Sequence, residues 1–256
     1  MPERSELLSS VKNALKILNS FSENEPVKKI TDLSRQLGIA KSTVSRLMST
    51  LASEGYVIKE QGSQKYRLGL SVLNLAGIVT STMDIHREAL PVLERLSKSV
   101  DETCHLVFLE GTEVVYLLKV ESSHPVRVSS HVGKHNPSHC TSSGKAILAY
   151  LDDEVVNRVI AGGLVRYTPR TITDPDQFRK DLQRVKKDGY SVSIEEFIQG
   201  VNTVGAPIRD YTGQVIAAIT IVGPAQRMHQ RNIQQYVKKV VDAAKEISEV
   251  MGHYAS

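Results

Sequence analysis

The segment 38–51, GIAKSTVSRLMSTL, carries apolar residues at positions i, i+3, i+4 and i+7, namely Val44, Leu47, Met48 and Leu51. This spacing is typical of one buried stripe along a helix. The opposite face combines hydroxyl groups with positive charge and has no acid, and it consists of Lys41, Ser42, Thr43, Ser45, Arg46, Ser49 and Thr50. The pattern predicts an amphipathic helix that presents a cationic surface.

Two further helices are predicted upstream of this segment. The first has an apolar stripe at helical spacing, and the polar, proline-containing SENEP at 22–26 ends it. That stripe consists of Val11, Leu15, Leu18 and Phe21. The second helix carries Ile30, Leu33 and Leu37. Thr31 and Asp32 suit its first turn, where a capping group and a negative charge are both favourable.

The second and third helices are separated by a short turn at Gly38, which tolerates a positive φ. Two helices joined in this way are typical of a helix-turn-helix, in which the first braces the second so that its N-terminal end enters the major groove. There Lys41 and Arg46 would reach phosphates or guanine edges. The small hydroxyl residues of this turn of helix would let the backbone approach, and they are Ser42, Thr43 and Ser45.

A strand-like hairpin is predicted directly after the third helix. Residues 56–59 and 65–68 flank a turn at Gly62, and Lys65 and Arg67 lie on the return strand. A hairpin in this place is the wing of a winged helix-turn-helix. Three packed helices alone would also fit a module that binds no nucleic acid, and the basic hairpin favours DNA binding.

Beyond residue 85 helical and strand-like runs alternate. Helices are predicted at 86–103, 144–151, 152–160, 174–189 and 232–251. Strands are predicted at 104–120 as two runs about a turn, and at 125–132, 190–194, 203–210 and 214–223. A sheet with helices on its face leaves a concave place for one small molecule. The uncharged segment 69–83 fits either a linker helix or a core helix of the larger domain.

Composition changes the picture mainly through where the charge lies. A chain of 256 residues favours two domains, and its net charge is only +4. Between residues 28 and 67, however, eight basic residues face three acids, a local balance of 8 − 3 = +5. Concentrated charge on a short module indicates a polyanion partner, although a solvated basic face would explain the charge equally well.

Nothing in the sequence points to a membrane or to secretion. No run of about 18 apolar residues occurs, and the N-terminal MPERSELLSS lacks the apolar region of a signal peptide. Two cysteines, Cys104 and Cys140, fit a reducing compartment better than a disulfide scaffold. We therefore expect a cytoplasmic location and no membrane partner.

Several motifs resemble successive signatures of the IclR family of bacterial transcriptional regulators. They are VKNALKILNSF, ITDLSRQLGIAKSTVSRLMSTLASEGYV, KYRLGLSVLNLA, GKAILAYL, TITDP, GYSVSIEEFIQGV and GAPIRDYTGQVIAAITIVGP, from about residue 10 to 250. The resemblance implies an α+β chain with three parts. These are a winged helix-turn-helix DNA-binding domain at 7–69 (helix-turn-helix about 30–50), a linker helix at 70–84 that helps to pair two subunits, and an effector-binding and oligomerisation domain of GAF-like or profilin-like α/β fold at 85–256.

The resemblance also implies where an effector binds, near the start of the GKA helix and around EEFIQGV. Residues Gly144, Lys145 and Ala146 would offer backbone N–H groups at a helix N-terminus, which suits a carboxylate.

The remaining implied pocket positions depart from the pattern of many relatives. Ser193 stands where they carry Asp, and Thr203 stands where they carry Cys. Of two serines that relatives often carry, Thr220 keeps the hydroxyl and Val222 does not. We expect a small carboxylate or a sugar acid, and the sequence leaves its identity open.

Metal binding and catalysis are both weakly indicated. His131, His135, His139 and Cys140 lie within ten residues, but Gly133 and Pro137 interrupt any helix that would align the histidines for zinc. SSGKA, at 142–146, lacks the full phosphate-loop motif. Residue types of a nucleophilic triad occur without the G-x-S-x-G elbow, namely Ser142, Ser143, His139 and Asp152. We expect no metal, no cofactor and no catalytic residue.

The sequence thus predicts a ligand-controlled regulator that binds double-stranded operator DNA as a homodimer or a tetramer, with repression more expected than activation. The alternative is a small-molecule sensor or enzyme whose N-terminal helices only mediate subunit contacts. The acid-free face at 41–50 favours the regulator, and a gel-shift with the upstream DNA would separate the two.

Overall fold

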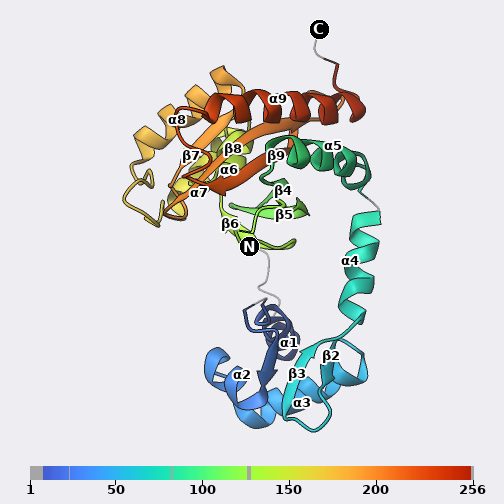
Figure 1. Cartoon of the computed structure of the whole chain (residues 1–256). Coiled ribbons are helices and arrows are strands. Elements are labelled where there is room, and N and C mark those ends of the chain that lie inside the picture. The colour runs from blue at the N-terminus through green and yellow to red at the C-terminus, as the bar shows by residue number, and fades with distance from the viewer. Residues whose placement is uncertain (1–7, 23, 82, 126–127, 255–256) are drawn as a thin grey trace. The chain divides into compact units, whose positions relative to one another are not determined.

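The computed structural model describes residues 8–22, 24–81, 83–125 and 128–254. The chain divides into two compact units, residues 1–82 and 83–256 (Figure 1). Within the described residues, no helix is both long enough and apolar enough to cross a membrane.

The first unit is three helices packed on a small antiparallel sheet, with a fourth helix at its end. Its elements are α1 (Ser9–Asn19), β1 (Val27–Lys29), α2 (Ile30–Leu37), α3 (Lys41–Ser53), β2 (Val57–Lys59), β3 (Lys65–Leu68) and α4 (Ser71–Ser81). The strands lie in the order β1-β3-β2. The stripe predicted on α3 is confirmed, because Val44 and Met48 are fully buried and Leu47 packs against the same core.

The stripe predicted on α1 is only half right, because Leu18 and Phe21 pack against the core but the other two residues do not. The buried residue of the helix is Ile17, whereas Val11 and Leu15 are 53% and 55% exposed. Ala14, Ile17, Leu18 and Phe21 also fall at i, i+3, i+4 and i+7, so the helix offers two overlapping apolar stripes. Packing against α2 and α3 selects the second stripe, and the spacing of apolar residues in the sequence gives no information about that packing.

The start of α2 differs in detail from the prediction. The helix begins at Ile30 directly after β1, and its N-cap, Lys29, makes no side-chain capping bond, so Thr31 has no capping role. Asp32 does lie in the first turn, and Gly38 ends the helix at φ +65° as predicted. Strand β1 was not predicted, because three residues after a proline show no alternation.

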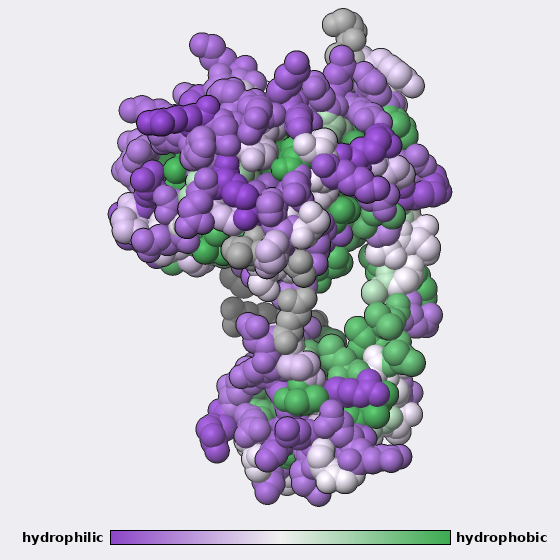
Figure 2. Space-filling view, viewed as in Figure 1, coloured by the Kyte–Doolittle hydropathy of each residue, from purple (hydrophilic) through white to green (hydrophobic). Residues whose placement is uncertain are grey.

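Helix α4 buries none of its residues. Of the two alternatives for this segment, a core helix of the larger domain is therefore ruled out. Figure 2 shows apolar side chains gathered along α4. Four large ones are exposed on the helix, namely Leu73, Leu75, Ile78 and Val79, and Leu70 is exposed directly before it. An apolar surface of this kind calls for a partner.

The second unit is a six-stranded antiparallel sheet in the order β6-β5-β4-β9-β8-β7, with helices on both faces. Its strands are β4 (Thr103–Glu110), β5 (Glu113–Val120), β6 (His135–Pro137), β7 (Ser191–Ile194), β8 (Val201–Arg209) and β9 (Val215–Pro224). Its helices are α5 (Asp84–Val100), α6 (Ser142–Leu148), α7 (Asp153–Ala161), α8 (Pro175–Asp188) and α9 (Ile233–Val250).

Alternation along the strands divides the two faces of this sheet. Ala217, Ile219 and Ile221 of β9 join the main core beneath α5 and α9. Ala218 and Thr220, between them, face the other side, where Ala218 packs against Ile147 of α6. The same sheet thus closes the core with one face and leaves the other for α6 and a cavity.

Two predictions for the second unit need correction. Of the strand predicted at 125–132, residues 126–127 lie outside the described residues, and residues 128–132 form no strand. The sheet edge is instead β6, whose Asn136 pairs with Val114 of β5. The segment is held at Ser130, whose carbonyl accepts a hydrogen bond from Lys119 Nζ.

The start of α6 is the second correction, since it begins two residues before the predicted 144. Thr141 is its N-cap and accepts a hydrogen bond from the Gly144 amide. The signals that predicted α8 are confirmed, because Asp174 accepts from the Gln177 amide at 2.8 Å and Gly189 follows the helix at φ +79°.

Gly144 is expected to tolerate no side chain. A Cβ there would lie 2.1 Å from the Ser138 carbonyl oxygen, which is backbone and cannot swing away. Gly144→Ala should lower the calorimetric transition of the second unit by about 4 °C or more, equivalent to about 2 kcal/mol.

Gly162→Ala is the matched control, because its Cβ would make only an ordinary contact, 3.4 Å from the Arg158 oxygen. Its transition should move by less than about 1 °C. Equal shifts for the two variants would contradict the packing argument.

Candidate functional site

The outer face of α3 is a basic, acid-free surface, and we call it the α3 basic face. Lys41, Ser42, Thr43 and Arg46 are exposed on it, and Ser45 is half-buried. Fully buried Val44 and Met48 fix the rotation of the helix, so these side chains are turned outward. Neither Lys41 nor Arg46 has an ion-pair partner among the described residues.

The hairpin after α3 extends the positive charge. On β3, Lys65 and Arg67 are exposed on either side of Tyr66, which is in the core. Strand register adds one cation on the same face, because Lys29 of β1 pairs with Lys65. Lys59 of β2 pairs with Tyr66 and therefore lies on the other face of the sheet, its Nζ 6.0 Å from the ring centroid.

Lys28 does not contribute to this surface, although it was counted in the basic module. It is only 4% exposed, and its ammonium contacts the Glu25 carboxylate and Gln36 Oε1, the latter at 2.8 Å. The local charge of +5 therefore overstates the positive charge that α3 and the hairpin present. Lys28 is buried whereas Lys29 is exposed, and a count of charges cannot reveal this difference.

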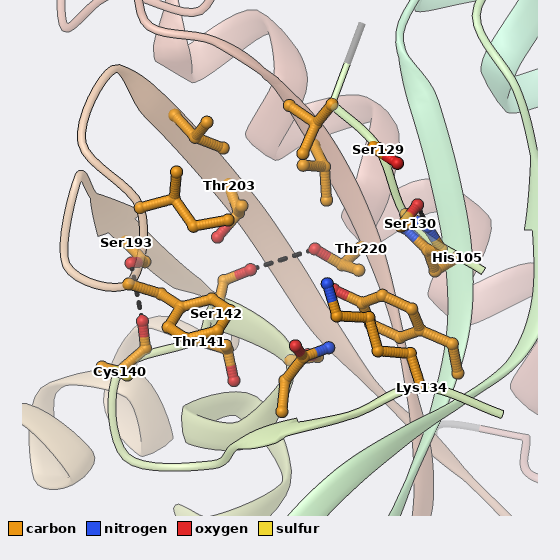
Figure 3. A pocket seen from close by; sticks show the side chains of 18 residues that line it. His105, Ser129, Ser130, Lys134, Cys140, Thr141, Ser142, Ser193, Thr203 and Thr220 are labelled. Atoms are coloured by element: carbon orange, nitrogen blue, oxygen red, sulfur yellow. Dashed lines mark hydrogen bonds between the residues drawn. The ribbon is translucent and has the colours of Figure 1, made fainter. Parts of the chain in front are cut away.

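The second unit contains a cavity against the sheet face that α6 also covers (Figure 3). The empty space between its walls is about 540 Å³. Its walls are residues of strands β4, β5, β7, β8 and β9, of the segments 128–136 and 140–143, and of the connection after β7.

Three of the predicted pocket residues line this cavity, and they are Ser193, Thr203 and Thr220. Thr220 Oγ1 lies 3.0 Å from Ser142 Oγ and donates to the Val204 carbonyl at 3.0 Å. Ser193 donates to the Cys140 carbonyl at 3.1 Å (Figure 3). The Thr203 hydroxyl has no partner among the described residues.

The structure does not bring Gly144, Lys145 and Ala146 into the cavity wall. Because α6 starts at Ser142, these residues lie within the helix. The Gly144 and Lys145 amides are bonded to Thr141, at 3.3 Å to its hydroxyl and 3.0 Å to its carbonyl. Ala146 belongs to a small core cluster. The Gly144 and Lys145 amides of the expected carboxylate seat are therefore already occupied by intrachain bonds.

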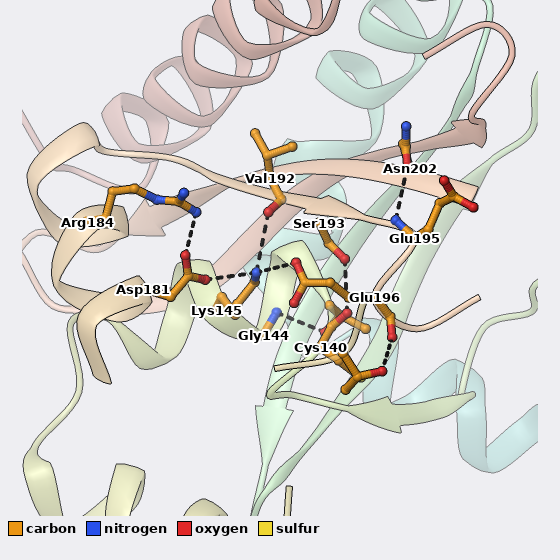
Figure 4. A network of polar contacts seen from close by, with 12 residues as sticks. Cys140, Gly144, Lys145, Asp181, Arg184, Val192, Ser193, Glu195, Glu196 and Asn202 are labelled. Atoms are coloured by element: carbon orange, nitrogen blue, oxygen red, sulfur yellow. Dashed lines mark hydrogen bonds and ion pairs between the residues drawn. The ribbon is translucent and has the colours of Figure 1, made fainter. Parts of the chain in front are cut away.

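Lys145 instead forms a buried ionic cluster (Figure 4). Its Nζ lies 2.6 Å from Glu196 Oε1 and 2.9 Å from Asp181 Oδ2, and its side chain is fully buried. Arg184 approaches the other Asp181 oxygen at 2.5 Å. Burial raises the pKa of Glu196, and the Lys145 charge opposes that shift. The cluster fastens the connection whose next residue, Phe197, lines the cavity.

His105 and Tyr116 are cavity residues that the sequence did not single out for this role. Their rings stack at 4.1 Å between centroids, and His105 Nε2 lies 2.7 Å from Ser130 Oγ. Burial, aided by Lys119 and Lys134, lowers the pKa of His105 to about 3, so its ring is neutral at pH 7. Burial raises the pKa of Tyr116 to about 12.

The histidines considered for metal binding diverge in the structure. His139 Nε2 contacts the Val165 carbonyl at 3.0 Å, and exposed His135 lies between the carboxylates of Glu110 and Glu113. Cys140 is buried in the cavity wall, where burial raises its pKa to about 12. Within the part of the chain that the structure describes, no three His, Cys, Asp or Glu residues form a metal-holding group.

Two family models match the chain. Residues 10–61 match the IclR helix-turn-helix domain, and residues 77–249 match the bacterial transcriptional regulator IclR C-terminal domain. HTH-type transcriptional regulator KdgR of Escherichia coli K12 is 34% identical over 248 residues, covering 96% of this chain and 94% of that protein. HTH-type transcriptional repressor AllR of Salmonella typhi is 31% identical, with coverage of 95% and 90%.

Solved structures agree with this match. An IclR homologue from Microbacterium hydrocarbonoxydans in complex with 4-hydroxybenzoate has a TM-score of 0.84 at 27% identity, covering 95% of this chain and 99% of that one. The Thermotoga maritima IclR structure has a TM-score of 0.78 at 28% identity, with the same coverage.

Breaking the ionic cluster is expected to destabilise the second unit. Lys145→Met leaves two buried carboxylates without their ammonium partner, which should cost about 3–5 kcal/mol. Arg184→Met removes only the exposed partner of Asp181 and should cost less than about 1 kcal/mol. Calorimetry of the full chain measures both. A loss for Lys145→Met as small as that for Arg184→Met would contradict the cluster's structural role.

Proposed function

The chain belongs to the IclR family of bacterial transcriptional regulators, and on this basis we propose that it is a repressor whose operator affinity is set by a small metabolite. The observation that carries the proposal is the acid-free α3 basic face beside a basic hairpin. In this proposal residues 7–69 bind DNA, residues 70–84 link and help to pair subunits, and residues 85–256 bind the effector and complete the oligomer.

The N-terminal end of α3 enters the major groove in this proposal. Lys41 and Arg46 anchor phosphates and read bases, while Ser42 and Thr43 lie close to the DNA backbone or the groove. Ser45 is half-buried, and its small side chain lets the helix backbone approach the DNA closely. The α3 basic face carries no acid that would repel phosphate, which supports this orientation.

The hairpin adds phosphate contacts through Lys65 and Arg67, which share the exposed face of β3. A homodimer, or a tetramer of two dimers, presents two such modules to half-sites one helical turn apart or a multiple of it. The exposed apolar side chains of α4 support pairing of two subunits along this helix.

The effector is a small carboxylate or sugar acid held in the cavity of the second unit. Ser193, Thr203 and Thr220 supply hydroxyl groups there, and Asp and Glu are absent from the lining described. Gly144, Lys145 and Ala146 lie outside the cavity wall, and they contribute by fixing helix α6, whose first residues Ser142 and Ser143 line the cavity. An effector that prefers one arrangement of the oligomer shifts operator affinity by about 1–3 kcal/mol. The family consists of regulators and not of enzymes, so the enzyme alternative is set aside.

Arg46→Ala should weaken specific operator binding by about 1–3 kcal/mol, because a base contact is lost. Lys65→Ala should weaken binding to all sequences alike and reduce the salt slope by about 1, because a phosphate contact is lost. Fluorescence anisotropy with the upstream DNA and with a scrambled duplex measures both effects. Lys12→Ala, an exposed lysine of α1, is the control, and unchanged binding by Arg46→Ala would count against the proposed orientation.

A screen of small carboxylates and sugar acids against the full chain should find one that raises the unfolding temperature and alters operator binding. At 100 times its Kd it should stabilise the chain by about 2.7 kcal/mol. Thr203→Val should weaken that ligand without lowering ligand-free stability, because the Thr203 hydroxyl makes no internal bond.

Thr220→Val is the comparison, since it loses bonds to Ser142 and Val204 and should also lower ligand-free stability. If Thr203→Val binds the ligand as tightly as the wild type does, the Thr203 hydroxyl is not part of the binding site. A screen in which no acid changes operator binding would contradict effector control.

A further inference from the structure

The segment Lys134–Asn136 forms one end of the cavity, and strand geometry decides which of its side chains face inward. Residues His135 and Asn136 of β6 pair with Val115 and Val114 of β5. Side chains two residues apart share a face, so Lys134 and Asn136 point the same way, and both line the cavity. His135, between them, faces the opposite side beside two carboxylates.

Lys134 is the charged member of the lining described. No acid belongs to that lining, and no described carboxylate lies within 4.0 Å of Lys134 Nζ. Its backbone is held in place, because its carbonyl accepts from the Tyr116 amide at 3.2 Å and its amide donates to the His131 carbonyl at 3.3 Å. A half-buried ammonium without a counter-ion, at a fixed place in a cavity, favours an anionic ligand.

Asn136 adds a donor at the same end. Its side-chain nitrogen is buried and has no hydrogen-bond partner among the described residues, and the residue is only 2% exposed. Buried donors are rarely left unsatisfied, so an unpartnered one in a cavity wall points to an acceptor supplied by a ligand. An ammonium and an amide N–H two residues apart together suit the two oxygens of a carboxylate.

The other end of the cavity offers hydroxyl groups instead of charge. Figure 3 shows Lys134 on the opposite side of the cavity from Ser193 and Thr203. The Thr203 hydroxyl is also without a partner among the described residues. A ligand that satisfies both ends therefore carries a carboxylate at one end and a hydroxyl or oxo group at the other.

We propose that Lys134 Nζ and Asn136 Nδ2 bind the carboxylate of the effector, and that Thr203 and Thr220 bind its hydroxyl or oxo oxygen. This assignment rests on the proposed function, and it moves the carboxylate seat from the α6 amides to the β6 edge of the sheet. The ligand is then a hydroxy or oxo monocarboxylate that lies along the cavity.

The test is calorimetric titration of the full chain with matched acids and neutral analogues: 4-hydroxybenzoate with 4-hydroxybenzamide, D-gluconate with D-glucitol, and pyruvate with acetone. At least one acid should bind about tenfold more tightly than its neutral partner. Lys134→Gln should remove that advantage, and Lys134→Arg should retain binding within about threefold. Asn136→Asp, which changes an amide to a like charge, should abolish binding of the acid.

Lys98→Gln, an exposed lysine of α5, is the control, and the unfolding temperature of each variant shows that it folds. The assignment is overturned if Lys134→Gln binds the acid like the wild type, if the neutral analogues bind equally well, or if no acid binds at about 10 mM. Operator binding is measured on the same samples. If DNA binding is normal while any of these results is obtained, only the proposed anion site is wrong. If the chain does not bind DNA, the proposed function as a regulator is wrong.

Discussion

A strand places successive side chains on only two faces, and both candidate sites of this chain depend on that constraint. On β9, Ile219 and Ile221 enter the main core while Thr220 faces the cavity. On β3, Tyr66 enters the core of the first unit while Lys65 and Arg67 stay outside. Burial of the apolar residues of each strand therefore fixes the direction of its polar residues. A shift of the strand register by one residue would lose both the core packing and the site.

The cavity wall that lies away from the sheet has a different kind of support. The connection after β7 is held through Glu196 by the buried ammonium of Lys145, which also meets Asp181 of α8. Because the charges are buried, the arrangement is stable only when all three groups are present. Phe197 thus reaches the cavity from a segment fastened on its far side, and the lysine of the GKA motif has a structural position rather than a ligand contact.

Much of the fold follows from local patterns. The helical stripe of α3, the glycine turn at Gly38 and the Asp174 cap of α8 are each set by a few neighbouring residues, and the structure confirms them. One prediction failed where two local choices were equally good, because the stripe that α1 buries was decided by contacts with segments distant in the sequence. The start of α6 at Ser142 follows a local cap, Thr141, that the prediction did not use.

Family membership, the two-part organisation and the basic character of α3 follow from residue types and short spacings, so they can be recognised in the sequence alone. Which residues meet in the cavity depends instead on how distant segments pack. His105, Tyr116, Lys134 and Asn136 come from three strands and a turn, and strand order and register, which no local pattern encodes, bring them together. The fold likewise removes Lys28 from the exposed basic surface, because the residue is buried in an ion pair with Glu25 that exists only in the folded chain.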